Sequence, residues 1–370
     1  MHVGMTTFFQ NIGHANSDAA VYRHEMAMAD LAEPLGFDSI WGAEHHFDDY
    51  TMCPNVAQFL TYMAARTSRV KLGSMVMVLP WHDPVRLAEE VSVLDNLSGG
   101  RVILGIGRGL GRVEFRGFRA PMGESRERFT EYAQALLQGL ETGTIAFDGK
   151  YCRQPEVAIR PAPIASFRDR TYAASVSPQS LEIMCRLGVG LLIIAQKPWE
   201  TTIAELTDYR RRFLEVNGRA APKPLIASFI AVHEDEATAR EMFDKYIRGY
   251  ARSAVAHYEF HNEGLADIPG YEYYGKLASN IRKHGLDSFV SFLAELQVWG
   301  TPDQVFQKLA EHQRRADCGG LIGAFSYGGM PHDLAKQNIR LFADKVLPRL
   351  QAIDAGCEIG GGVPLTIAAE

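Results

Sequence analysis

At residues 40–47 the chain reads Ile40-Trp41-Gly42-Ala43-Glu44-His45-His46-Phe47. An apolar run that ends abruptly in an acid and two histidines is typical of a barrel enzyme, in which the carboxyl ends of parallel strands bring reactive side chains into one pocket. Alternation along a strand places Trp41 and His45 on one face and Glu44 and His46 on the other. We therefore expect only one histidine to point into the mouth of the barrel, although alternation does not say which.

Strand and helix patterns alternate along most of the chain. Besides residues 39–46, strand patterns occur at residues 2–9, 70–80, 102–107, 171–176, 190–195, 225–233 and 320–326. A helical pattern follows each strand, and Pro84 and Pro302 are each placed to begin a helix. Eight such units without a break in composition predict an α/β fold, a single closed (β/α)8 TIM barrel, rather than an open doubly wound sheet.

Two segments interrupt the alternation and are interpreted as insertions. Residues 141–169, after strand 4, are polar and proline-bearing, and residues 258–299, after strand 7, are rich in tyrosine and glycine. We interpret the second insertion as a lid that excludes water, with a disordered segment or an oligomer contact as alternatives. We expect residues 1–350 to form the barrel domain and residues 351–370 a loosely held C-terminal tail.

Composition excludes several classes of function. The net charge is −6, and the chain has no long run of Lys and Arg, which argues against binding to nucleic acid or to a membrane surface. Five cysteines without a C-x-x-C pair indicate reduced thiols rather than disulfides or a zinc site. Since we find neither a signal-peptide pattern nor an apolar run of transmembrane length, we expect a cytoplasmic protein.

The fourth strand ends in a glycine-rich segment. It reads Gly105-Ile106-Gly107-Arg108-Gly109-Leu110-Gly111-Arg112, and Leu110 and Arg112 stand where a dinucleotide fingerprint would need glycine. The glycines let the backbone approach a ligand closely, and Arg108 is placed to bind a phosphate or carboxylate. An ion pair between Arg108 and a nearby acid such as Glu114 is the alternative.

A second candidate anion site lies where the fifth strand meets its helix. The segment reads Ser175-Val176-Ser177-Pro178-Gln179-Ser180. If Ser177 caps the helix, free backbone N–H groups and the hydroxyls of Ser177 and Ser180 converge at its positive end. Because Arg108 comes from the neighbouring strand, we predict that these groups bind one anion together, although an ordinary helix cap has the same pattern.

The two histidines also allow a structural role or a metal site. In the structural role, the pair only caps the strand through backbone hydrogen bonds. A metal site would need a third ligand such as His82 or Asp83, and adjacent histidines on opposite strand faces rarely bind one ion. No metal is therefore predicted.

A set of short motifs occurs in a fixed order along nearly the whole chain. It comprises 44–47 (EHHF), 78–80 (VLP), 82–91 (HDPVRLAEEV), 94–101 (LDNLSGGR), 108–110 (RGL), 115–116 (FR), 124–126 (ESR) and, more weakly, 346–348 (VLP). In this order and spacing the motifs resemble the bacterial luciferase family of flavin-dependent monooxygenases. That resemblance implies a (β/α)8 barrel that binds reduced FMN from a separate NAD(P)H:flavin reductase, reacts it with O2 and holds a C4a-peroxyflavin.

The resemblance also implies roles for single residues. His45 matches the active-site histidine that manages protons on the flavin, and Glu44 is its neighbour. Met75 and Val76 match a peptide, often cis, that supports the isoalloxazine ring. The 5′-phosphate cradle corresponds to Arg108, Ser177 and Ser180, with Ser175 and Val176 beside it.

Two positions depart from the light-emitting members of the family. Those proteins carry a reactive cysteine at the position of Gly107 and a glutamate at that of Val176. We expect Gly107 to lie beside the flavin and to leave more room at its edge. The departures leave light emission on an aldehyde open.

We therefore expect an FMN-dependent monooxygenase that oxygenates a small, mostly hydrophobic substrate by hydroxylation or by Baeyer–Villiger type insertion. Phe8, Trp41 and Met77 are predicted to line the substrate pocket, which must exclude water. An F420-dependent oxidoreductase, a metal-dependent hydrolase and a non-catalytic flavin-binding subunit are the alternatives. The helices at residues 54–67 and 84–97 resemble the family's dimer surface, so we expect a dimer of identical or different subunits.

Overall fold

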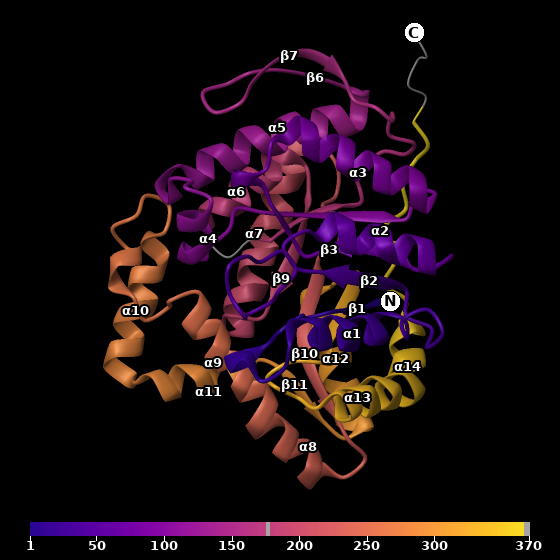
Figure 1. Ribbon diagram of the computed structural model, residues 1–370, viewed down its shortest axis with the longest axis vertical. Helices are drawn as coiled ribbons and strands as arrows, with labels where there is room; N and C mark the ends of the chain where they lie inside the picture. Colours follow the sequence, from indigo (N-terminus) through magenta and orange to yellow (C-terminus); the bar gives the residue numbers. More distant parts are fainter. Residues whose placement is uncertain (175–177, 366–370) are drawn as a thin grey trace.

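The computed structural model describes residues 1–174 and 178–365, with the backbone alone at residues 178 and 179. Within this part of the chain, eight parallel strands close into a barrel (Figure 1). Strand β1 pairs with both β2 and β12, and β10 pairs with both β9 and β12, so the ring has no free edge. The predicted single (β/α)8 barrel is confirmed. The barrel strands are β1 (His2–Thr6), β2 (Ser39–Gly42), β3 (Lys71–Ser74), β5 (Val102–Gly107), β8 (Thr171–Ala174), β9 (Gly190–Ile194), β10 (Leu225–Val232) and β12 (Gly320–Ala324).

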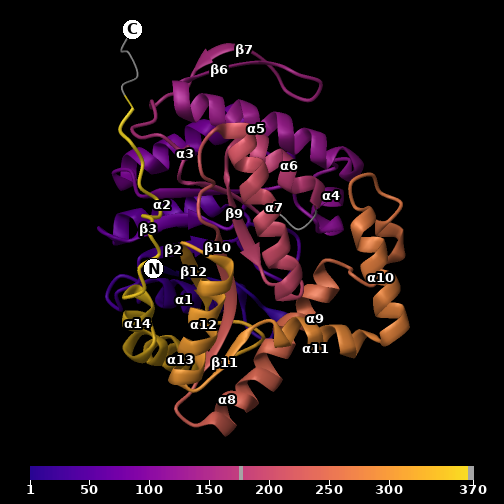
Figure 2. The same ribbon diagram turned by 180° about the vertical axis from the view of Figure 1, so that it is seen from behind.

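A helix follows each barrel strand and covers its outer side (Figures 1 and 2). The predicted starts at Pro84 and Pro302 are confirmed, because the side chains of Asp83 and Thr301 cap these helices. No helix in the described ranges combines the length and apolar content that crossing a membrane requires. The covering helices are α1 (Asp18–Ala29), α2 (Val56–Arg66), α3 (Pro84–Ser98), α5 (Ser125–Thr142), α6 (Pro178–Leu187), α7 (Trp199–Asn217), α12 (Pro302–Ala316) and α13 (His332–Lys345).

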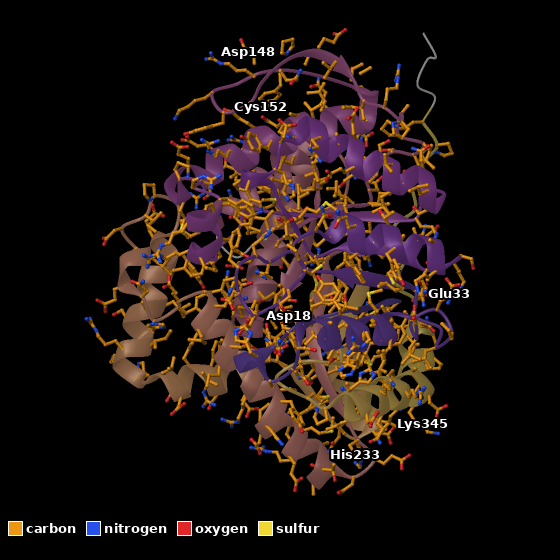
Figure 3. The ribbon with its side chains drawn as sticks, viewed as in Figure 1. Asp18, Glu33, Asp148, Cys152, His233 and Lys345 are labelled. Carbon is orange, nitrogen blue, oxygen red and sulfur yellow. The ribbon has the colours of Figure 1, made fainter. Side chains whose placement is uncertain are left out.

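The insertion after strand 4 is an antiparallel hairpin of β6 (Thr144–Asp148) and β7 (Arg153–Ala158). It lies outside α5, where Asp148 and Cys152 are labelled in Figure 3. The carboxylate of Glu131 on α5 accepts backbone N–H groups of residues 150–152 and so holds the hairpin turn. The stretch before α5 contains the short helix α4 (Arg112–Gly117).

The insertion after strand 7 is largely helical, so the disordered alternative is wrong for it. After β10 come α8 (Glu236–Met242), the short π-helical turn η4 (Phe243–Ile247) and α9 (Arg248–His257). Then follow α10 (Glu272–His284), α11 (Leu286–Glu295) and the short strand β11 (Val298–Gly300), which pairs with β10. Figures 1 and 2 both show α10 and α11 at one side of the barrel, with α4 and α9 nearest to them.

The amino-terminal end of the barrel is filled by a small apolar cluster around Trp41. Gly4 and Gly73 on the neighbouring strands make room for its indole, since a Cβ on Gly73 would lie 2.2 Å from the ring. Trp41 therefore forms the floor of the barrel. The cluster consists of Trp41, Ile103, Tyr172, Leu192, Leu225, Ala227, Ile322 and Ile359.

The C-terminal tail closes this floor from outside. Ile359 is buried in the cluster, the Lys71 ammonium donates to the Gly360 carbonyl (3.0 Å), and the Ser166 N–H donates to the Val363 carbonyl (2.8 Å). These contacts hold Ile359, Gly360 and Val363 of the tail against the barrel, and Ile359 completes the apolar floor. The domain boundary at residue 350 stays a prediction.

A buried ion pair ties α3 to the start of β8. The guanidinium of Arg170 donates to both carboxylate oxygens of Asp95 at 2.6 and 2.8 Å, and both side chains are fully buried. Arg170 also donates to the carbonyls of Val102, Ala165 and Ser166. The pair thus joins a helix, two strands and the segment that contacts the tail.

Glu25 is a second buried charge, and it predicts a pH-dependent stability. Its carboxylate accepts the Phe8 N–H (3.0 Å) and the Ser326 hydroxyl (2.5 Å). Burial raises the pKa of Glu25 to about 7, against the lowering effect of these two hydrogen bonds. The folded protein therefore holds this proton more tightly than the unfolded chain, so stability is full below about pH 4.5 and falls as the pH rises through 7.

We expect Glu25→Gln to raise the free energy of unfolding at pH 8 by about 2–3 kcal/mol, because glutamine fills the same space without a charge. At pH 5 the variant and the original protein should differ by less than about 1 kcal/mol. Urea unfolding at both pH values measures the difference. A stability gap that does not change between pH 5 and pH 8 would contradict this account of Glu25.

Candidate active site

A deep cavity opens at the carboxyl ends of the barrel strands. It encloses about 1370 Å³ including its open mouth. Each of the eight barrel strands, or the loop that directly follows it, contributes to the lining. This is the place where parallel-barrel enzymes bind their substrates.

His45 lies in the wall of this cavity and is held by Glu114 of α4. Its Nδ1 is 2.9 Å from Oε1 of Glu114, and its Nε2 is 3.3 Å from the hydroxyl of Tyr258. Glu114 also accepts the backbone N–H of His46 at 3.1 Å. The alternative that Glu114 pairs with Arg108 is therefore wrong. Because Glu114 forms a hydrogen bond with Nδ1, Nε2 is the nitrogen of His45 that is available to exchange a proton with a molecule in the cavity.

Glu44 also reaches the cavity wall, but its carboxylate is saturated with donors. It accepts hydrogen bonds from His46 (3.0 Å), His82 (2.9 Å), the Trp81 indole (2.6 Å) and the Val78 N–H (2.9 Å). Burial acts to raise the pKa of Glu44, but the hydrogen bonds from His46 and His82, the charge of His82 and the Trp81 hydrogen bond lower it to about 2. Glu44 stays ionised and holds the surrounding loops in place.

The question of which histidine faces the barrel mouth has a local answer. Strand β2 ends at Gly42, so strict alternation stops there, and Ala43, Glu44 and His45 all contact the cavity. His46 turns away and bonds Glu44. His82, which a metal site would have needed as a third ligand, bonds the same carboxylate rather than His45.

Two arginines meet at the part of the cavity formed by the end of β5 and by α5. Arg108 and Arg126 both donate to the carbonyl of Gly270, at 2.8 and 3.0 Å, and the Tyr271 ring lies 4.0 Å from the Arg108 guanidinium. Nε of Arg126 is buried without a hydrogen-bond partner in the described part of the chain. Burial, and then the charge of Arg108, lower the pKa of Arg126. Among the described residues neither arginine has an ion pair with a carboxylate.

Ser180, at the start of α6, lines the same cavity as the two arginines. The other predicted members of this anion site, Ser175, Val176 and Ser177, lie outside the described residues. Arg126 is not among the predicted site residues although it belongs to the 124–126 motif, because its place on a helix does not show that it reaches the cavity until α5 is packed against the end of β5.

The predicted ring support lies in the cavity as well. The peptide bond between Met75 and Val76 is cis, and both residues line the cavity. Gly107 lies opposite them, and a Cβ there would come within 2.3 Å of a Val76 methyl group. The extra room expected at Gly107 is therefore already occupied by Val76.

One of the three predicted substrate-pocket residues lies in the cavity and two do not. Phe8 lines it, as part of an aromatic wall. Trp41 lies one layer deeper, in the barrel floor. Val76 and Val78 face the cavity, whereas Met77, between them, faces the outer core. The other residues of the wall are Tyr50, Phe229, Tyr250, Tyr258 and Tyr274.

Comparison with known protein sequences identifies the family of this chain. The family model described as luciferase-like monooxygenase matches residues 1–317. The alkanal monooxygenase alpha chain of Aliivibrio fischeri is 25% identical over 324 residues, which cover 86% of this chain and 90% of that protein. An uncharacterised protein of Sinorhizobium fredii, y4vJ, is 32% identical over 183 residues, and here the match covers only 50% of this chain and 52% of that protein.

Solved structures show the same fold. The monooxygenase RslO1 from Streptomyces bottropensis has a TM-score of 0.76 at 23% identity, covering 95% of this chain and 100% of that chain. The oxygenating constituent of 3,6-diketocamphane monooxygenase from Pseudomonas putida, in complex with FMN, has a TM-score of 0.71 at 17% identity. The match covers 94% of this chain and 98% of that chain. An F420-dependent secondary alcohol dehydrogenase has a TM-score of 0.66 at 13% identity. The match covers 96% of this chain and 99% of that chain. The resemblance seen in the motifs is confirmed, and the chain belongs to the luciferase-like monooxygenase family.

Proposed function

We propose that this protein is an FMN-dependent monooxygenase, which takes reduced FMN from a separate NAD(P)H:flavin reductase and uses O2 to oxygenate a small hydrophobic substrate. The reaction is a hydroxylation or a Baeyer–Villiger type insertion. One observation carries the proposal: two arginines without a carboxylate partner in the described chain line the same cavity as the His45–Glu114 pair. The first feature suits an anionic cofactor, and the second suits proton transfer beside it.

The chain's residues fit the FMN phosphate. Arg108 and Arg126 offer guanidinium groups that match phosphate oxygens. Nε of Arg126 has no acceptor in the described chain, so it is available to donate a hydrogen bond to a phosphate oxygen. Ser180, at the start of α6, lines the same cavity and belongs to the proposed cradle, and Met75 and Val76, which also line it, are proposed to support the ring. Reduced FMN, when bound, supplies the electrons that activate O2.

The remaining lining residues exclude water and hold a proton. Nε2 of His45 gives or takes the proton, and Glu114 fixes the orientation of the imidazole through Nδ1. The insertion after strand 7 is proposed as a lid: the Gly270 carbonyl contacts both arginines, and Tyr274 lines the cavity. Presence of both the histidine and the arginine pair argues against a non-catalytic subunit.

We also propose a dimer in the cytoplasm. Tyr62 on α2 and Val93 and Leu97 on α3 are large apolar side chains that are 54%, 39% and 64% exposed. These helices pack side by side, so the exposed side chains offer an apolar surface for an identical or different subunit. The five cysteines are free thiols, as expected in a reducing compartment.

Replacing Arg108 and Arg126, one at a time, by methionine tests the phosphate cradle. We expect each change to weaken binding of reduced FMN by about 10- to 100-fold, the effect of losing charged hydrogen bonds, and to leave riboflavin binding unchanged because riboflavin has no phosphate. Anaerobic equilibrium titrations measure both affinities. Arg128→Met is the matched control, since Arg128 lies on the same helix but pairs with Glu124.

Equal affinity of the original protein for reduced FMN and riboflavin would show that the cradle does not bind phosphate. The same titration with reduced F420 separates the F420-dependent alternative. Tighter binding of F420 than of FMN would replace our proposal by that one.

A further inference from the structure

His257, the last residue of α9, is a buried histidine with one nitrogen engaged and one free. Its Nδ1 is 2.8 Å from Oδ2 of Asp48, and its side chain is 1% exposed. Its Nε2 is buried and has no hydrogen-bond partner within residues 1–174 and 178–365. The ring stacks on Tyr50 at 4.4 Å and meets the edge of His45 at 4.8 Å. A carboxylate on one nitrogen fixes the ring so that the other nitrogen can exchange a proton.

The free nitrogen of His257 faces the carboxylate that holds His45. One nitrogen of each histidine and one oxygen of Glu114 lie within 4.8 Å of one another. A Cβ on Gly111 would lie 2.6 Å from Oε2 of Glu114 and 3.1 Å from Nε2 of His257, so both atoms border the same small space. Gly111 has an ordinary φ of −64°, so its lack of a side chain matters here for space. A single water molecule spans such a gap.

A metal ion fits this cluster less well than a proton pathway does. Nδ1 of His45 and Oε1 of Glu114 already share a hydrogen bond of 2.9 Å, which an ion between them would break.

We infer that Asp48 and His257 form a positioning dyad that relays protons between solvent and His45 through Glu114. This inference rests on the proposed role of His45. Asp48 is 33% exposed and takes up the proton. As Nδ1 of His257 receives it, Nε2 releases one through the bridging water to Oε2 of Glu114. The carboxyl group of Glu114 then turns so that this proton faces Nδ1 of His45, which accepts it while Nε2 of His45 releases its own proton into the cavity, so one proton enters and one leaves.

The other titratable groups around the two histidines do not compete for this proton. Burial raises the pKa of Tyr250 to about 12 and holds those of Tyr50 and Tyr258 well above their usual value, so these hydroxyls stay neutral. Arg112 of α4 and Glu259 after α9 form their own ion pair at 3.3 Å. The charges that remain to act on His45 are those of Glu114, His257 and Asp48.

Two variants interrupt the relay in different ways. His257→Phe keeps a ring on Tyr50 and removes both nitrogens, whereas Gly111→Ala keeps both histidines and fills the space between Glu114 and His257. His312→Phe is the matched control, because His312 is a half-buried histidine whose buried Nδ1 also has no partner in the described chain, and its ring packs against Trp199 outside the cavity lining.

The test is a pH titration of the flavin-free protein with ¹⁵N-labelled histidines, followed by NMR. We expect the midpoint of His45 to rise by about 0.5–1 pH unit in both relay variants, because Glu114 then acts on His45 alone, and to stay unchanged in the control. In the protein loaded with reduced FMN, both variants should change the rate of FMN reoxidation by about 10-fold or more without changing FMN affinity.

An unchanged midpoint of His45 in both relay variants would overturn the relay. So would stoichiometric binding of Co²⁺ to the flavin-free protein that His257→Phe abolishes, since it would make the cluster a metal site. If the NMR coupling is found but reduced FMN does not bind, the proposed monooxygenase function fails while the coupling of the two histidines stands.

Discussion

His45→Gln is expected to lower oxygenation of the substrate by about 100- to 10,000-fold, the usual contribution of a general acid or base. Glutamine fills the place of the imidazole and can still bond Glu114, but it cannot take up or release a proton at the position of Nε2. Reduced FMN should bind with unchanged affinity, because Arg108 and Arg126 are untouched. The measurement is oxygenated product per FMN oxidised, with hydrogen peroxide as the by-product, over a panel of terpenoids, ketones and aldehydes.

His46→Gln is the matched control for this prediction. His46 is the adjacent histidine, and it bonds Glu44 instead of lining the cavity. A glutamine there can still donate to Glu44, so we expect a loss below about 10-fold. Equal losses in the two variants, or full activity of His45→Gln, would mean that another group handles the proton.

Asp95→Ala is expected to lower the free energy of unfolding by about 3–5 kcal/mol, because it leaves the guanidinium of Arg170 buried without its counter-charge. Both side chains are fully buried, so water cannot replace the carboxylate. Urea or guanidinium unfolding measures the change, at one pH and salt concentration.

An exposed ion pair serves as the control for Asp95→Ala. Arg66 and Asp30 form a similar two-pronged pair on the surface, with side chains 42% and 36% exposed. Asp30→Ala should therefore cost less than about 1 kcal/mol. A loss below about 1 kcal/mol for Asp95→Ala as well would show that the buried pair is not a main tie between α3 and β8.

Strand periodicity in the sequence was sufficient to predict the barrel and the place of its site. Each predicted barrel strand is present in the structure, and residues at strand ends, such as His45, Arg108 and Val76, line the cavity. Parallel strands in a closed barrel must deliver their carboxyl ends to one side, so this part follows from pattern alone. The depth of a side chain along the barrel axis does not follow from the pattern. For this reason the sequence predicts Trp41 in the pocket, whereas in the structure it fills the floor.

The sequence alone does not predict which residues contact these side chains. Glu114 and Arg126 lie on helices whose packing angle decides whether they reach the cavity. The Asp48–His257 contact joins residues 209 positions apart, a separation that no local sequence pattern reveals. Met77 was misplaced because its strand, β4 (Met77–Val78), begins anew after the Met75–Val76 peptide, so the faces had to be observed.

The central claim is that the cavity binds reduced FMN and shields it while it reacts with O2. Rapid mixing of the protein, loaded anaerobically with reduced FMN, with air-saturated buffer tests this most directly. We predict that FMN reoxidises in two phases, with a transient spectrum that belongs to neither reduced nor oxidised FMN, and that the Arg108→Met variant at the same concentrations shows a smaller transient. Single-phase reoxidation at the rate of free reduced FMN would contradict the account.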